Sequence, residues 1–485
     1  MEPEPASSLS RAVVRGSTWT LVGYGSGQIL RLLSNLTLWR LLYPEAFGLM
    51  ALVNVFMQGL GMFSDIGIGP SIVQSDRGDD PRYLNTAWTI QVLRGGALCL
   101  AAWLLAWPIA LFYKEPQLVR LIPVAALGAV VSGFNSTSLF TQTRKIRLGR
   151  LTAVDLLSQI VSLVVTIAWA WFHRTVWALV IGGLAASIVR LFLSHKYLPG
   201  IRNRLQWDRD CARALLRFGR WIFLSTLLTF AVMQSDRLIF GKLIPIGLLG
   251  VYSIALTWAT LPISVVGGVM SSVIFPLLSR LHQAGTDFSE AYLKARRPWA
   301  ILGGWASAGL IAGGPTLVRL LYDSRAIGAG WIIQILAAGV WLLVLETSNG
   351  VALLALGQPK WVAAGNAAKL IAMFVLIPLG YSRYSFPGAV AGFAASEILR
   401  YGTSVVGSRR YKVACLGQDL GLTMLTIGTS ALGLLTARMV RPLLAPISFR
   451  PAKLGVFLEG LCIALAVSIG WAWICLRGRQ SRPNS

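Results

Sequence analysis

The residues best suited to do chemistry in this sequence are ionisable side chains that stand inside long apolar stretches. The cations are Arg31, Arg94, Arg237, Lys369 and Arg400, and the acids are Asp65, Asp236, Glu346 and Glu397. A lone charge at mid-bilayer costs about 3 kcal/mol or more, so such residues usually face a partner or a wet pathway. We expect the cations to bind an anionic ligand such as a phosphate or uronate, and the acids to pair with them or to take part in coupling.

Other kinds of reactive site find little support in the sequence. The three histidines, His173, His195 and His282, show no metal-ligand spacing. The run GYGSGQ at 23–28 has neither the preceding strand nor the Lys-Ser/Thr ending of a phosphate loop. The five cysteines include no CxxC pair. We therefore expect no catalytic residues, no metal, no cofactor and no enzymatic activity.

The composition indicates which elements hold these charges. The 485 residues are 55% hydrophobic and only 13% charged, whereas a globular domain carries roughly 25% charged residues. The fold class is therefore all-α, a polytopic membrane protein. A net charge of +25 would suggest nucleic acid in a soluble chain, but basic loops of membrane proteins meet anionic headgroups instead. We expect a lipid bilayer as partner and no nucleic acid.

Apolar stretches long enough to cross about 30 Å of hydrocarbon recur along the whole chain, and the connections between them leave no room for an extramembrane catalytic domain. We predict about fourteen transmembrane helices, near 17–39, 46–66, 86–112, 118–140, 151–172, 175–194, 219–241, 248–275, 298–321, 328–356, 361–380, 386–406, 418–437 and 455–476.

The basic residues predict an orientation. With the N-terminus inside, 26 Lys and Arg lie on the inner side of the spans and 12 on the outer side. The opening MEPEPASSLSRAVVRGS lacks the apolar core of a secretory signal. We therefore expect a multi-pass membrane protein with both termini cytoplasmic.

An internal repeat predicts two halves. Shifting the sequence by 202 residues places Gly48 on Gly250 and Trp19 on Trp221, and it brings Arg31 near the Asp236–Arg237 pair. An offset of six helices implies a parallel repeat about an axis along the membrane normal. We predict an N-terminal lobe at 1–195 (helices 1 to 6), a linker at 196–218, a C-terminal lobe at 219–410 (helices 7 to 12) and a terminal helix pair with a cytoplasmic tail at 411–485.

The linker is basic and amphipathic. In a helix, Trp207, Cys211, Leu215 and Phe218 would share one face, and Arg209, Arg213 and Arg217 another. We expect this segment to lie on the cytoplasmic membrane surface with its apolar face in the lipid.

Several longer motifs resemble one known family. The segment 34–74 is similar to the opening of bacterial polysaccharide (lipid-linked oligosaccharide) flippases, the Wzx-like polysaccharide transporters of the multidrug/oligosaccharidyl-lipid/polysaccharide exporter superfamily. Four further segments are similar to the same family. They are 85–118 with Arg94, QSDRLIFGKLIPIGLLGVYSIALTWATLP with the Asp236–Arg237 motif, LLALGQPKWVAAGNAAKL, and GAVAGFAASEILR. The similarity runs from about residue 10 to 412.

The resemblance implies fourteen helices in two lobes around a central cavity. It also implies a transporter that flips an undecaprenyl-diphosphate-linked oligosaccharide across the inner membrane by alternating access. The pathway would make exopolysaccharide, capsule or O-antigen. A polysaccharide polymerase and the export machinery would be further partners of the transporter. Transport would be coupled to a proton or sodium gradient. Arg94 and the Asp236–Arg237 pair carry over as family residues, whereas Arg31, Lys369 and Arg400 rest on the charge argument alone.

Other functions stay open at this point. A peptidoglycan-precursor flippase or a drug/cation antiporter would share the architecture, although a binding site for organic cations should be dominated by acids and aromatic rings. A membrane polysaccharide polymerase or ligase should carry a long outward loop with paired acidic or basic groups. The longest outward connection, about 438–454, contains no acid and no histidine.

Overall fold

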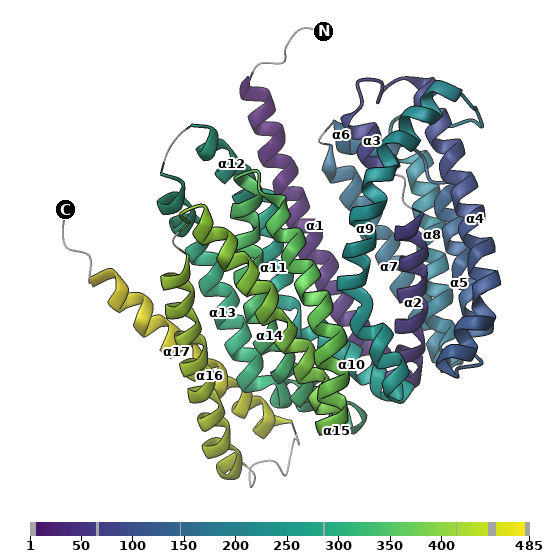
Figure 1. Cartoon of the computed structure of the whole chain (residues 1–485). Helices are drawn as coiled ribbons and strands as arrows, with labels where there is room; N and C mark the ends of the chain where they lie inside the picture. The colour runs from purple at the N-terminus through teal and green to yellow at the C-terminus, as the bar shows by residue number, and fades with distance from the viewer. Residues whose placement is uncertain are drawn as a thin grey trace. The chain divides into compact units, whose positions relative to one another are not determined.

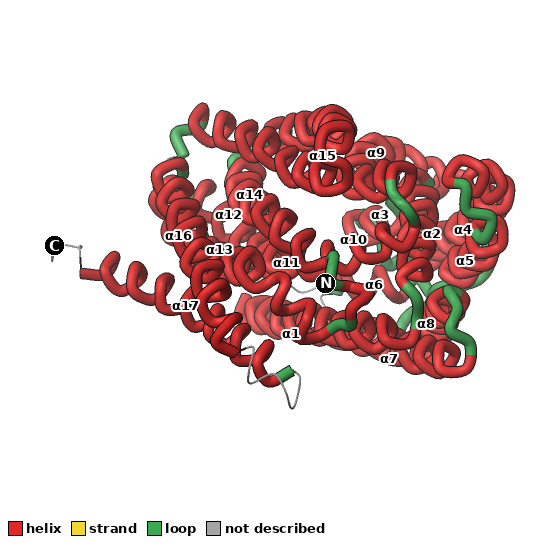
Figure 2. Tube along the Cα trace, turned by 90° about the horizontal axis from the view of Figure 1, so that it is seen from below, coloured by secondary structure: helices red, strands yellow, loops and turns green. Residues whose placement is uncertain are grey.

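The computed structural model describes residues 6–64, 67–145, 147–284, 287–413, 415–444 and 453–480. Within these ranges all regular structure is helical and no strand occurs (Figures 1 and 2). The all-α membrane architecture predicted from composition is therefore confirmed.

Two compact units divide the chain, Met1–Gly250 and Val251–Ser485. Helix α9, which the sequence assigned to the second lobe, packs against α2 and α4 of unit 1. The lobe boundaries predicted from the repeat stay a prediction.

Unit 1 is built from ten helices, the last of which crosses its boundary. They are α1 (Ala6–Leu41), α2 (Pro44–Phe63), α3 (Ile68–Gln74), α4 (Pro81–Tyr113), α5 (Leu118–Gly133), α6 (Ser138–Arg144), α7 (Leu148–Phe172), α8 (Trp177–Lys196), α9 (Arg209–Leu243) and α10 (Ile246–Ala259). Helix α5 packs between α4 and α8, and α7 between α8 and α1. Helices α5 and α6 form a bent pair with an angle of 60°.

Unit 2 consists of α11 (Leu261–Val269), η1 (Met270–Ile274), α12 (Phe275–Gln283), α13 (Phe288–Leu321), η2 (Ser324–Ala326), α14 (Ala329–Ala355), α15 (Pro359–Arg410), α16 (Leu416–Leu444) and α17 (Leu454–Gln480). Helix α14 packs against both α13 and α15. The 52-residue α15 is interrupted at Tyr384 and Ser385, where the φ of Ser385 is 53°. It therefore consists of two helical halves joined by a kink.

Ten described helices are long and apolar enough to cross a membrane, or eleven if the bent α5 and α6 form one span. The other three predicted spans fall on α1, α9 and the second half of α15. Over the described residues, each predicted stretch thus falls largely on helical structure, and the number fourteen stays approximate.

Helix α4 illustrates how local sequence sets a helix boundary. Asp80 precedes it as N-cap, and its carboxylate accepts a hydrogen bond from the amide of Arg82 at 2.9 Å. Pro81 follows at the first helical position, where a missing N–H does no harm. The hydrogen bond from Arg77 lowers the pKa of Asp80.

The starts of α2 and α10 meet in a reciprocal contact inside unit 1. A methyl group added at Gly48 would overlap the carbonyl oxygen of Ile246, and one added at Gly250 would overlap that of Pro44. Ile246 is 202 positions after Pro44, and Gly250 is 202 positions after Gly48, so the two halves of the contact are related by the same offset as the repeat. Only glycine allows the two backbones to approach this closely.

We expect Gly48→Ala or Gly250→Ala to destabilise the protein by about 1–3 kcal/mol, because the new methyl group forces the two helices apart. The measurement is the melting temperature of the purified protein in detergent. Gly96→Ala is the matched control, since Gly96 lies in α4 with no atom within 4 Å of an added methyl group. Equal melting temperatures for all three variants would contradict the tight contact.

Candidate functional site

Four of the predicted charged residues meet inside unit 2. Glu346 lies on α14, Lys369 on the first half of α15, and Glu397 and Arg400 on its second half. Nζ of Lys369 donates to Oε1 of Glu397. The Arg400 guanidinium lies 3.2 Å from Oε2 of Glu346 and 3.9 Å from Oε2 of Glu397. The ion pairs form one continuous chain, and we call these four residues the charge cluster.

Close packing of the two halves of α15 brings the cluster together. A methyl group at Gly392 would overlap the carbonyl oxygen of Leu376, so the second half lies directly against the first. At this short spacing the side chains of Lys369 and Glu397 reach each other. The Lys369 ammonium also lies 5.2 Å from the centre of the Phe393 ring, a favourable cation–π distance.

The charge cluster is electrically neutral. Glu346, Lys369 and Glu397 are buried, and the side chain of Arg400 is 17% exposed. Removing one member of a buried ion pair costs about 3–5 kcal/mol, because its partner is left uncompensated. Carboxylates thus already neutralise Lys369 and Arg400. An anionic ligand would have to compete with Glu397 and Glu346, and the predicted substrate role of the two cations stays a prediction.

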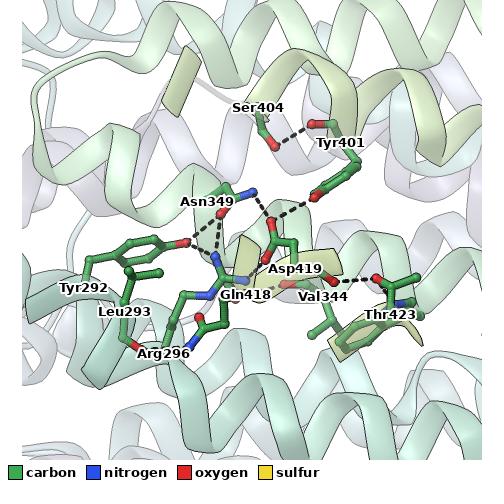
Figure 3. A network of polar contacts seen from close by, with 12 residues as sticks. Tyr292, Leu293, Arg296, Val344, Asn349, Tyr401, Ser404, Gln418, Asp419 and Thr423 are labelled. Carbon is green, nitrogen blue, oxygen red and sulfur yellow. Dashed lines mark hydrogen bonds and ion pairs between the residues drawn. The ribbon is translucent and has the colours of Figure 1, made fainter. Parts of the chain in front are cut away.

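Unit 2 also contains a second polar network, which Figure 3 shows. Arg296 of α13 donates to Asp419 of α16, to Asn349 at 2.9 Å and to Tyr292 at 2.7 Å. The hydroxyl of Tyr401 donates to Asp419 at 2.8 Å. Arg296 and Asp419 are fully buried. These five residues, which we call the Arg296 network, tie four helices of unit 2 together.

The sequence analysis missed the Arg296 network. It counted Arg296 among the inward loop residues, because the predicted span began at 298, whereas α13 begins at Phe288 after its N-cap Asp287. Two signals were available. Phe288, Tyr292 and Arg296 recur every four residues, which places them on one face of a helix. Asp419 is the only acid in α16.

The charge cluster and the Arg296 network occupy neighbouring turns of the same helices. Glu346 and Asn349 are one turn apart on α14, and Arg400 and Tyr401 are adjacent on α15. A polar track therefore runs through the interior of unit 2.

Arg94 lies in unit 1 and reaches the end of α2. Its guanidinium donates to Ser64 Oγ at 2.9 Å and to the Gly61 carbonyl oxygen at 2.6 Å. A cation suits the negative end of a helix dipole, so this contact stabilises the end of α2.

Arg94 also lines a cavity of about 570 Å³ within unit 1. Its other charged lining residues are Asp155 and Arg190, which form an ion pair at 3.2 Å. The uncharged polar side chains include Gln91 and Asn135. With two guanidinium groups and one carboxylate, the wall carries a net positive charge and suits an anionic group. We call this space the Arg94 cavity.

The remaining predicted residues are spread over unit 1. Arg31 is exposed on α1, Asp236 is buried on α9, and Arg237 is half-buried. Arg237 donates to Gln234 at 2.7 Å, and Gln234 donates to Gln58 of α2 at 2.6 Å. Asp65 lies outside the described residues. The predicted central cavity would join residues of both units, and it stays a prediction.

Comparisons with known proteins agree with the sequence motifs. A family model described as "Polysaccharide biosynthesis protein" matches residues 37–327, more than half of the chain. The chain belongs to this family. The family resemblance inferred from the sequence is therefore confirmed.

Two curated relatives have distant sequences. The teichuronic acid biosynthesis protein TuaB of Bacillus subtilis is 22% identical over 300 residues, which are 61% of this chain and 61% of TuaB. The match thus spans less than two thirds of TuaB. The lipopolysaccharide biosynthesis protein WzxC of Escherichia coli is 21% identical over 393 residues, 81% of this chain and 80% of WzxC.

The fold has a clear counterpart among solved structures. Lipid II flippase MurJ, in an inward closed conformation, aligns with a TM-score of 0.72 at 13% identity over 96% of this chain and 99% of MurJ. This likeness shows a shared fold.

The burial of the Arg296 network generates a test. Arg296→Met leaves Asp419 charged in the interior, so we expect a loss of about 3–5 kcal/mol and a lower melting temperature. Adding Asp419→Asn removes that charge and keeps an acceptor for Tyr401, so the double variant should regain part of the loss. Arg325→Met is the control, because the Arg325–Asp323 pair is partly exposed and contributes at most about 1 kcal/mol. Equal losses for Arg296→Met and Arg325→Met would contradict the role of the network.

Proposed function

We propose that this protein is a flippase that moves an undecaprenyl-diphosphate-linked oligosaccharide across the bacterial inner membrane by alternating access. It would serve the biosynthesis of a cell-surface polysaccharide such as exopolysaccharide, capsule or O-antigen. Membership in the polysaccharide biosynthesis protein family is the observation that carries this proposal. The proposal assigns no covalent chemistry to the chain.

The named relatives support a polysaccharide precursor as substrate. TuaB and WzxC are named for the biosynthesis of teichuronic acid and of lipopolysaccharide. MurJ is named as a flippase of lipid II. The second candidate function is a peptidoglycan-precursor flippase, the kind of function for which MurJ is named. Fold likeness at 13% identity says nothing of the substrate, so we rank the polysaccharide precursor first.

The Arg94 cavity supports an anionic passenger. A diphosphate carries negative charge that a planar guanidinium can bind through two parallel hydrogen bonds. The volume of about 570 Å³ lies within the usual range for a small-molecule site. In our proposal, Arg94 and Arg190 bind the diphosphate or an acidic sugar. A drug/cation antiporter would need the opposite charge balance.

The charge cluster supports coupling to an ion gradient, preferably of protons. If Glu397 or Glu346 takes up a proton, one ion pair is lost and Lys369 or Arg400 becomes available to an anion. In a low-dielectric interior such a change of one charge is worth several kcal/mol, enough to favour a different helix arrangement. Proton uptake and substrate binding would then share the same cations.

The apolar helices make the chain a multi-pass membrane protein. We propose that it lies in the inner membrane with both termini cytoplasmic, because 26 basic residues fall on that side of the predicted spans and 12 on the other. Anionic headgroups, a polysaccharide polymerase and the export machinery are its proposed partners.

A double-substitution cycle tests the roles of the charge cluster. Lys369→Gln or Glu397→Gln alone leaves a buried charge with one partner fewer, so protein abundance should fall. The double variant is again neutral and should regain abundance. If the cluster acts in transport, surface polysaccharide per folded molecule should still fall at least tenfold in the double variant, because the lost charge-assisted contact is worth about 1.5–3 kcal/mol.

Export is measured against cells that lack the chain, and abundance is measured in purified membranes. The matched control is Lys294→Gln with Glu290→Gln, an exposed Lys–Glu pair that should change neither quantity. Normal export per folded molecule in the Lys369→Gln/Glu397→Gln variant would show that the cluster is purely structural.

A further inference from the structure

Residues 201–208, between α8 and α9, have no regular secondary structure and are hydrogen-bonded to the N-terminal turns of α4. We call this segment the strap. The amide of Arg204 donates to Asn85 at 3.1 Å, and the amide of Gln206 donates to Thr89 at 2.9 Å. The Thr89 hydroxyl in turn donates to the Gln206 carbonyl oxygen at 2.9 Å. Side chains of α4 thus take the place of a helical or strand partner for the strap backbone.

Both ends of the strap are also fixed. Near its start, the side-chain amide of Asn203 accepts a hydrogen bond from the Ser136 hydroxyl at 2.9 Å and donates one to the Thr137 hydroxyl at 2.8 Å. Ser136 and Thr137 both lie at the break between α5 and α6. At its end, Asp208 caps α9 and accepts hydrogen bonds from the amides of Cys211 and Asp210. These hydrogen bonds lower the pKa of Asp208, and the bond from the Cys211 amide has the largest effect. The strap is therefore held in place along its whole length.

The strap presents apolar side chains that unit 1 does not cover. Leu205 is 70% exposed and Trp207 is 55% exposed. Arg202 and Arg204 are exposed beside them. Unlike the exposed apolar residues of the long helices, Leu205 and Trp207 belong to a segment that cannot span a bilayer, so ordinary lipid contact along a span does not account for them.

The structure changes the sequence-based interpretation of this region. A helix over the linker would have placed Trp207, Cys211 and Leu215 together on the membrane surface. Instead α9 begins at Arg209, and both Cys211 and Leu215 are fully buried in a core cluster with Tyr83. Of the proposed lipid-facing residues whose side chains the structure describes, Trp207 alone is exposed.

The length of α4 indicates the depth of the strap. With 33 residues the helix is about 50 Å long, and the hydrocarbon core is about 30 Å thick. With the helix centred in the bilayer, about 10 Å at each end extends beyond the hydrocarbon. Asn85 and Thr89, which bind the strap, lie about 6–12 Å from the start of the helix at Pro81. The strap thus lies at the boundary between headgroups and acyl chains.

We propose that the strap is an interfacial anchor that binds anionic phospholipid. Leu205 and Trp207 enter the boundary layer, where tryptophan is favoured, and Arg202 and Arg204 bind the headgroup phosphates. Charge complementarity commits the site to anionic lipid, because Asp208, the one acid within the strap, is already engaged by backbone amides. The anchor does not depend on which substrate the protein moves.

Photocrosslinking of the full chain tests the depth of the strap. The protein is placed in nanodiscs of phosphatidylcholine and phosphatidylglycerol with p-benzoylphenylalanine at position 205 or 207. Both side chains are exposed, so neither change should disturb folding. Lipid adducts found by mass spectrometry are expected at both positions and not at the control position 210, whose side chain is 84% exposed on the first turn of α9. A crosslink to a second protein chain, or lipid adducts no more frequent than at 210, would overturn the anchor.

Lipid selectivity tests the two arginines. A basic residue near an anionic surface is worth about 1 kcal/mol, so Arg202→Gln with Arg204→Gln should weaken binding of phosphatidylglycerol about fivefold per arginine in native mass spectrometry. Arg209→Gln with Arg213→Gln removes the same charge from α9 and is the matched control. If both double variants bind phosphatidylglycerol equally weakly, the lipid is attracted by the overall positive charge of the protein. That result would overturn a lipid site on the strap. Because neither experiment measures transport, failure of the anchor is distinguishable from failure of the proposed function.

Discussion

Buried charges that cannot reach water must find partners, and this constraint organises unit 2. Arg296 is fully buried and is compensated by Asp419, and Tyr292 and Asn349 accept further hydrogen bonds from its guanidinium group. The charge cluster satisfies the same requirement between α14 and the two halves of α15. Because an uncompensated charge would cost about 3–5 kcal/mol, these pairs fix which helix faces meet. The apolar surface, which looks much the same all round such helices, could not specify this alone.

The same constraint separates two kinds of cationic site. Lys369 and Arg400 are neutralised within unit 2, whereas the Arg94 cavity of unit 1 keeps a net positive wall. A wall with a net positive charge can attract and receive an anion, although Arg190 is paired with Asp155. A neutral cluster can do so only after a carboxylate leaves or takes up a proton, and that condition is what a transporter coupled to a gradient requires. In our proposal the two sites therefore have different tasks, reception of the anion and coupling.

The sequence was informative wherever a property belongs to one helix. Apolar length located the spans, and ionisable residues within them pointed to Glu346, Lys369, Glu397 and Arg400 before any contact was known. Pairing was not predictable, because it depends on how each helix is rotated against its neighbour. Arg296 was missed for a related reason: hydropathy marks where a helix enters the lipid, and α13 begins ten residues before the predicted span. Trp207 was expected to share a helix face with Cys211 and Leu215. It lies in the strap instead, because side chains of α4 that are distant in sequence take the backbone hydrogen bonds of this segment.

The most direct test of the proposed function is reconstitution of the purified chain in liposomes with a labelled undecaprenyl-diphosphate-linked oligosaccharide in one leaflet. Appearance of the label in the other leaflet is measured with a membrane-impermeant quencher. The proposal predicts transfer at least tenfold faster than in protein-free liposomes, and a slower transfer when Arg94→Gln and Arg190→Gln remove the positive wall of the cavity. The proposal would be contradicted if the labelled oligosaccharide lipid moves no faster than in protein-free liposomes while the same protein is folded and moves lipid II or an organic cation.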